Sequence, residues 1–102
     1  MPTFANPTLK VSFVLPERLS LGAYDRYQIA MAKGSGVELT QARFNALVFG
    51  AAVEAGLVSE WQCDSMPTLP PPDVNAVDAV VVIFCGQTIA EWVRAQVTVP
   101  KA

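Results

Sequence analysis

The longest apolar segment of the chain runs from Ala79 to Ala90 and contains no charged residue. Asp78 precedes it, and Glu91 and Trp92 follow it. A bilayer span needs roughly 20 apolar residues, so this segment is too short to cross a membrane. It is apolar around most of a helical circumference, which a single packed face does not explain. The pattern therefore predicts a segment that is buried on several sides, within its own domain or against another chain.

Three stretches repeat apolar residues with the helical period, and each has a capping residue in front of it. The predicted helices run from Leu21 to Lys33, from Gln41 to Ala55 and from Ala76 to Gln96. Their expected N-caps are Ser20, Thr40 and Asn75, and the first two helices are expected to end at Gly34 and Gly56. Gly50 lies inside the second helix, where it costs about 1 kcal/mol relative to Ala. We therefore expect a packing reason for it, namely the close approach of another helix.

Two shorter stretches read as strands. Residues Lys10 to Leu15 alternate between apolar and polar side chains, and Leu57 to Cys63 is extended with Trp61 facing inward, so the two can pair. Residues 1–8 are predicted to form an extended N-terminal arm, followed by a single globular domain over 9–102. The proline-rich connector at 65–73 is predicted to be a stiff crossover, with a segment that binds an aromatic groove as the alternative. The expected fold class is α+β and mainly helical, with three helices packed on a small two- or three-stranded antiparallel sheet.

Composition favours association with other proteins. The chain is 52% apolar and only 16% charged, against a usual charged share of roughly 25%. This deficit indicates an oligomer or a standing partner, and the alternative is a small domain with a large core and an Ala-rich surface. For the two tryptophans, core anchoring is the more common role in so small a domain, and partner binding is the alternative. The residues expected to bind a partner are Phe49, Val53, Trp61, Val81, Phe84, Ile89 and Trp92.

Charge and chemistry exclude several classes of function. The net charge is −2 and the basic residues are scattered singly, so neither nucleic acid nor a membrane surface is an expected partner. The chain has no histidine, and Cys63 and Cys85 alone cannot complete a four-ligand zinc site. Cys85 is expected to be a small buried apolar residue, while a disulfide to Cys63 stays open. We expect no catalytic, cofactor-binding or metal-binding residues, and hence no enzyme. With no signal peptide at the N-terminus, a cytoplasmic location is expected.

Four segments together resemble a known family. They are FVLPERLSLGAYDRYQIAM, SEWQC, the proline-rich break and AEWVRAQVTVPKA. In their order along the chain and in their general residue composition, they are similar to the small tail assembly chaperones of long-tailed bacteriophages. The resemblance implies a homo-oligomer in the host cytoplasm that coats the apolar helices of the tape-measure protein. It also implies recruitment of tail tube protein and release before the virion matures. Several such proteins have a second, longer form made by a ribosomal slip, which the codons available for Val99 to Lys101 would permit. The alternative is a permanent virion protein, such as a head–tail connector or cement subunit.

Overall fold

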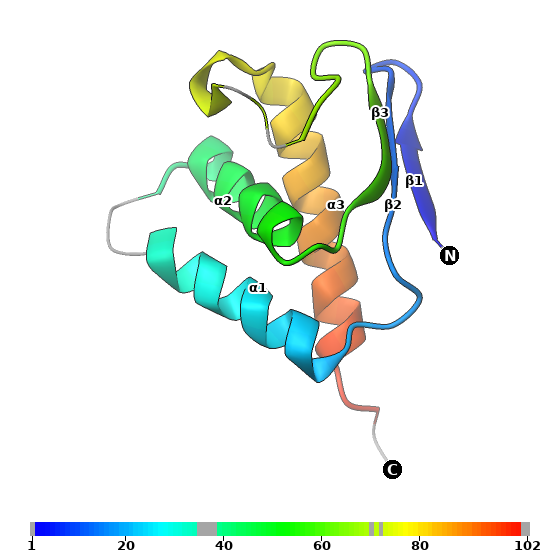
Figure 1. Ribbon diagram of the computed structural model, residues 1–102, viewed down its shortest axis with the longest axis vertical. Coiled ribbons are helices and arrows are strands. Elements are labelled where there is room, and N and C mark those ends of the chain that lie inside the picture. Colours follow the sequence, from blue (N-terminus) through cyan, green and yellow to red (C-terminus); the bar gives the residue numbers. More distant parts are fainter. Residues whose placement is uncertain (1, 35–38, 70, 72, 101–102) are drawn as a thin grey trace.

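The computed structural model describes residues 2–34, 39–69, 71 and 73–100. Within these residues the fold is α+β and mainly helical, as predicted, with three α-helices and a three-stranded antiparallel sheet. The helices are α1 (Leu21–Gly34), α2 (Gln41–Glu54) and α3 (Ala79–Val97), and the strands are β1 (Thr3–Asn6), β2 (Val11–Val14) and β3 (Ser59–Cys63). Figure 1 shows α3 along the long axis of the molecule, with the sheet on one side and α1 and α2 on the other.

Local capping fixes the start of α1 and both ends of α2. The hydroxyl of Ser20 accepts a hydrogen bond from the backbone N–H of Ala23 at 3.2 Å, and Thr40 caps α2 in the same way. Helix α2 ends where Gly56 adopts a φ of +76°, a conformation that glycine reaches without a steric penalty. The N–H groups of Gly56 and Leu57 then bond back to the last turn of the helix, which satisfies carbonyls that would otherwise lack partners.

The predicted start of the third helix was wrong. Asn75 does not cap α3; it lies in a short 3-10 helix, η1 (Val74–Ala76), whose first turn is capped by the carboxylate of Asp73. The backbone is extended at Val77, and α3 begins one residue after Asp78, whose side chain accepts from the N–H of Val80 at 3.2 Å. Asp73 therefore caps η1, and Asp78 caps α3. These two caps divide the segment that the apolar periodicity predicted to be one helix.

The sheet has the order β1-β2-β3, and both neighbouring pairs are antiparallel. The predicted pairing of the two strands, here β2 and β3, is confirmed, with Val11 opposite Cys63 and Ser12 opposite Gln62. Strand β1 lies within the segment that was expected to be an arm, and it pairs with β2 so that Phe4 faces Phe13. The inward face of the sheet therefore carries aromatic side chains toward α3.

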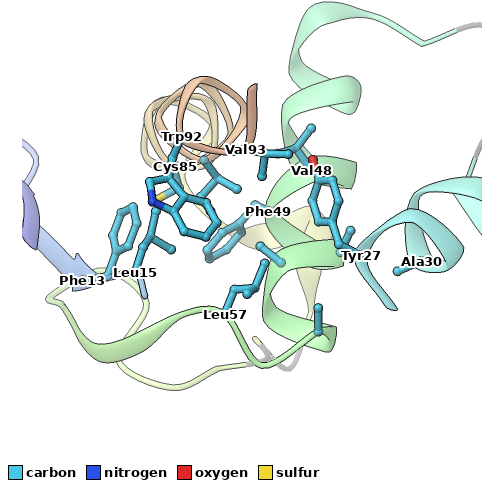
Figure 2. Close-up of a cluster of buried hydrophobic side chains, with 14 of the residues drawn as sticks. Phe13, Leu15, Tyr27, Ala30, Val48, Phe49, Leu57, Cys85, Trp92 and Val93 are labelled. Atoms are coloured by element: carbon cyan, nitrogen blue, oxygen red, sulfur yellow. The ribbon is translucent and has the colours of Figure 1, made fainter. Parts of the chain in front are cut away.

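The core is formed by side chains from the sheet, from all three helices and from the segments beside them. Figure 2 shows Phe13, Tyr27, Phe49 and Trp92 converging from four separate elements. In the apolar segment of α3, Val81, Val82, Cys85, Gly86 and Ile89 are buried, whereas Val80 is 48% exposed. The segment is thus covered on several sides by its own domain.

Close helix packing occurs at a different glycine from the one expected. A Cβ added to Gly86 would lie 2.5 Å from the carbonyl oxygen of Asn45, so α2 and α3 cross with their backbones nearly touching. A Cβ added to Gly50 would meet nothing within 4 Å among the described residues. The expectation for Gly50 is therefore wrong within this chain, and the side of α2 on which it lies is open.

Candidate partner-binding groove

An apolar groove runs along the open side of α2. Its larger hollow has a volume of about 380 Å³, and a second hollow of about 190 Å³ continues it toward the start of α2. The larger hollow is lined by Ala46, Phe49, Gly50, Val53, Glu54, Met66, Pro71, Val77 and Val82. The smaller one shares Ala46, Val77 and Val82 and adds Ala42, Arg43, Asn75 and Ala79. We call the two hollows together the α2 groove.

One wall of the α2 groove is α2 itself, and it is low. Ala46 and Gly50 lie one turn apart on this wall, and they are the two smallest residue types. Phe49 and Val82 are buried and form the floor. A low apolar wall with a closed apolar floor allows another backbone to approach α2 closely.

The other wall comes from the proline-rich connector and the residues that follow it. The indole N–H of Trp61 donates a hydrogen bond to the carbonyl of Met66 at 2.6 Å, and the Met66 side chain is 4% exposed. This anchor turns the chain back toward α2, so that Pro71 and Val77 line the hollow. Pro70 and Pro72, which belong to the predicted connector, lie outside the described residues.

Charges of opposite sign mark the two ends of the α2 groove. Arg43 lies in the first turn of α2 and Glu54 is its last residue, and both are exposed. At 1.5 Å per residue the two positions are about 16 Å apart along the helix. Each charge is at the end of the α2 dipole that disfavours it, at a cost of about 0.3–1 kcal/mol. Glu54 also pairs with Lys33 of α1 at 3.2 Å, an exposed ion pair of the kind that contributes little stability.

The structure brings two of the seven predicted partner-binding residues to the groove, Phe49 and Val53. Val81, Ile89 and Trp92 are buried in the core, with at most 8% of each residue exposed. Trp61 and Phe84 are half-buried, and both contact the ring of Phe13. These five side chains have contacts within the fold, and for the tryptophans this matches the core-anchoring interpretation.

Sequence reasoning missed most of the groove. The lining residues that are not among the predicted partner-binding residues are Ala42, Arg43, Ala46, Gly50, Glu54, Met66, Pro71, Asn75, Val77, Ala79 and Val82. Gly50 carried a usable signal, because its cost to the helix predicted the close approach of another helix, and the structure leaves that side of α2 open. Met66 and Pro71 carried none, since the connector has no periodicity and its return over α2 depends on tertiary packing.

The two thiols lie away from solvent. Cys63 and Cys85 are free and buried, and Cys85 is fully buried, as predicted. Burial, and secondarily the nearby Cys63, raises the pKa of the Cys85 thiol to about 12. The thiol is therefore protonated at neutral pH and is a weak nucleophile. Among the described residues no group of three or more His, Cys, Asp or Glu side chains could hold a metal ion.

Helix α3 (Ala79–Val97) extends beyond the apolar segment Ala79–Ala90. At 19 residues, with a mean hydropathy of 1.2 over an 18-residue window, it meets the length and composition requirement for a membrane span in the described part of the chain. The core helix of a globular domain meets the same requirement, and 39% of that window is buried inside this protein. Length and composition thus allow either role.

Comparison of this chain with protein-family models, with curated proteins and with solved structures gives no match.

Proposed function

We propose that this protein is a non-catalytic assembly chaperone that binds an apolar helix of a client protein in the α2 groove. The observation that supports this most directly is the groove itself, which is apolar, about 380 Å³ in its larger part and bounded by a low helix wall. Amphipathic helices bind such grooves by inserting apolar anchors spaced three or four residues apart.

The size of the groove limits the client segment. A length of about 16 Å corresponds to roughly three helical turns, which present two or three anchor side chains. Each aliphatic or aromatic anchor contributes about 1.5–3 kcal/mol on burial, from which the costs of association are subtracted. The resulting affinity is modest and reversible, as a chaperone that later leaves its client requires.

The resemblance to phage tail assembly chaperones supports a particular client. In this proposal the client is the tape-measure protein, whose long apolar helices need cover in the host cytoplasm before the tail is built. Tail tube protein would then join the complex. The low share of charged residues, 16%, and the apolar groove are both consistent with a protein that works by contact with other proteins.

Co-purification with the products of neighbouring genes tests the proposal. The wild-type chain is expected to retain a long helical protein, and Val53→Asp is expected to lose it, because a carboxylate in an apolar contact is costly. Leu21→Asp controls for the added charge, since Leu21 is 83% exposed at the start of α1 and outside the α2 groove. Because Val53 is partly buried against the core, thermal melting of Val53→Asp checks separately that this variant folds. Retention of the client by Val53→Asp, with Leu21→Asp unchanged, would contradict the assignment of the groove.

Purified particles separate a chaperone from a permanent virion protein, the second function that the sequence allows. A chaperone is expected in lysates of infected cells and absent from purified virions. A head–tail connector or cement subunit would be found in the virion in stoichiometric amounts. Mass spectrometry of purified particles against the infected lysate decides between the two.

A further inference from the structure

We infer that, without a client, the α2 groove is occupied by a second copy of this chain, with the two α2 helices packed antiparallel about a two-fold axis. The inference names an occupant of the groove of the proposed function, but it concerns the protein alone and needs no client. The charges at the ends of the groove and the open side of α2 support this arrangement.

The charges point to an antiparallel partner helix. Arg43 and Glu54 lie at the ends of α2 where the dipole of their own helix disfavours them. An antiparallel helix alongside brings its negative C-terminal end next to Arg43 and its positive N-terminal end next to Glu54. Both charges are then favourably placed. Their arrangement therefore suits a neighbouring helix of this polarity better than it suits α2 itself.

A second copy of α2 supplies the complementary charges as well as the polarity. When Arg43 of one copy lies opposite Glu54 of the other, the two-fold axis requires the reciprocal pair at the other end. Both residues are exposed, and Glu54 can accept from Arg43 of the second copy while it keeps Lys33, since a carboxylate accepts several hydrogen bonds. One register thus satisfies two ion pairs.

The same register places the smallest residues at the centre. Ala46 and Gly50 lie on either side of the midpoint between Arg43 and Glu54. In the antiparallel pair, Ala46 of one copy therefore comes close to Gly50 of the second copy, and the reverse. Helices approach to about 8 Å only where the contacting side chains are small. The open space around Gly50, in which an added Cβ meets nothing within 4 Å, is then filled by the second α2.

The contact is small enough to be reversible. A three-turn helix pair with its groove walls belongs to the low end of interface sizes, below about 1,200 Å². We therefore expect a dimer that dissociates in the micromolar range and exposes the groove to a client. The second copy and the client compete for one surface, which keeps the apolar floor covered in either state.

Charge reversal tests the register, with sedimentation equilibrium of the isolated protein at low salt as the measurement. Arg43→Glu alone and Glu54→Arg alone are each expected to weaken the dimer at least tenfold, because each creates two pairs of like charge. An equimolar mixture of the two variants is expected to recover most of the affinity that each variant loses alone, since the heterodimer again has two attractive pairs. The double variant R43E/E54R keeps two attractive ion pairs but reverses the contacts between these charges and the dipole of the neighbouring helix, so it is expected to dimerise more tightly than either single variant and more weakly than the wild type.

Gly50→Leu tests the central contact. It is expected to be monomeric and to melt no lower than the wild type, because the added side chain has room in the monomer and leucine favours the helix. A wild type that stays monomeric up to about 1 mM would overturn the inference. So would a dimer that survives Gly50→Leu, or a mixture of charge variants that does not recover. None of these outcomes involves a client, so the client-binding proposal stands or fails separately by co-purification.

Discussion

At Gly86 the side chain is a single hydrogen because α2 leaves no room for more. The nearest atoms to an added Cβ are the Cβ and carbonyl oxygen of Asn45, both at 2.5 Å, and backbone does not move aside as a flexible side chain does. We expect Gly86→Ala to lower the free energy of unfolding by about 1–3 kcal/mol, although alanine is the better helix former. Urea denaturation measures it.

Gly50→Ala is the control for Gly86→Ala. It is expected to raise the free energy of unfolding by about 0.5–1 kcal/mol, because it adds helix propensity in open space. Equal effects of the two substitutions would contradict the crossing geometry. The sequence shows two glycines in two apolar helices, and only the packing of α2 on α3 distinguishes them.

Trp61 acts through its ring and its N–H separately. The centroid of the Trp61 ring is 5.9 Å from that of Phe13 and 5.5 Å from that of Phe49. The indole N–H donates a hydrogen bond to the carbonyl of Met66. Trp61→Phe keeps an aromatic ring and removes the donor, so we expect a loss of about 0.5–1.5 kcal/mol in unfolding free energy. We also expect faster proteolysis of the 64–69 segment, which would lose its anchor. Unchanged stability together with unchanged proteolysis would show that the anchor contributes nothing.

At the scale of elements, the sequence predicted the helices better than the strands. Ser20 and Thr40 are followed directly by their helices, so local chemistry and tertiary packing agree. Before α3 the sequence offers three possible capping residues. Asn75 was the expected cap, but the side chains of Asp73 and Asp78 cap the two helical turns of this segment. Strand β1 has only four residues and exists through its pairing with β2. Such non-local contacts leave little trace in a short sequence pattern.

The end of α3 is tied to the segment before α1 by one side chain. Gln96 donates from Nε2 to the carbonyl of Glu17 at 3.2 Å and accepts from the N–H of Leu19 at 3.0 Å. We expect Gln96→Ala to cost about 1–2 kcal/mol, because two hydrogen bonds between distant elements are lost. Gln96→Glu is expected to be no better, since a carboxylate would face the carbonyl of Glu17. Gln87→Ala, exposed on the same helix, is the control and should leave the urea midpoint unchanged.

At the scale of the whole molecule, the apolar excess is divided between the core and the surface. The domain covers most of Ala79–Ala90 by itself, so this segment alone does not require a partner. What remains open is the α2 groove and single exposed side chains such as Leu21, Ile29 and Phe44. Scattered apolar side chains are normal on a monomer, whereas a continuous apolar groove marks a binding surface. The proposed functions therefore depend on the groove and not on the total composition.

The pH dependence of stability is the last prediction at this scale. Without histidine, no side chain has an ordinary pKa between about 5 and 8, so stability should stay flat near neutrality. Burial raises the pKa of Cys85 from 9.0 to about 12, and burial followed by Tyr24 raises the pKa of Tyr27 above 10.0. Both groups favour the protonated form in the folded state, so their contribution is complete below pH 9 and is lost as the pH rises toward 12.

The loss of unfolding free energy at alkaline pH has a maximum slope, and Cys85→Ala tests how much of it comes from the buried thiol. Each group contributes at most about 1.4 kcal/mol per pH unit, so urea denaturation should show a steepening decline above pH 9. Cys85→Ala is expected to start lower, because it leaves a small cavity, and to decline less steeply, because one titrating group is gone. Tyr24→Phe should leave the Cys85 contribution intact and serves as the control. If wild type and Cys85→Ala lose stability at the same rate between pH 9 and 12, another group causes the loss and the buried thiol does not.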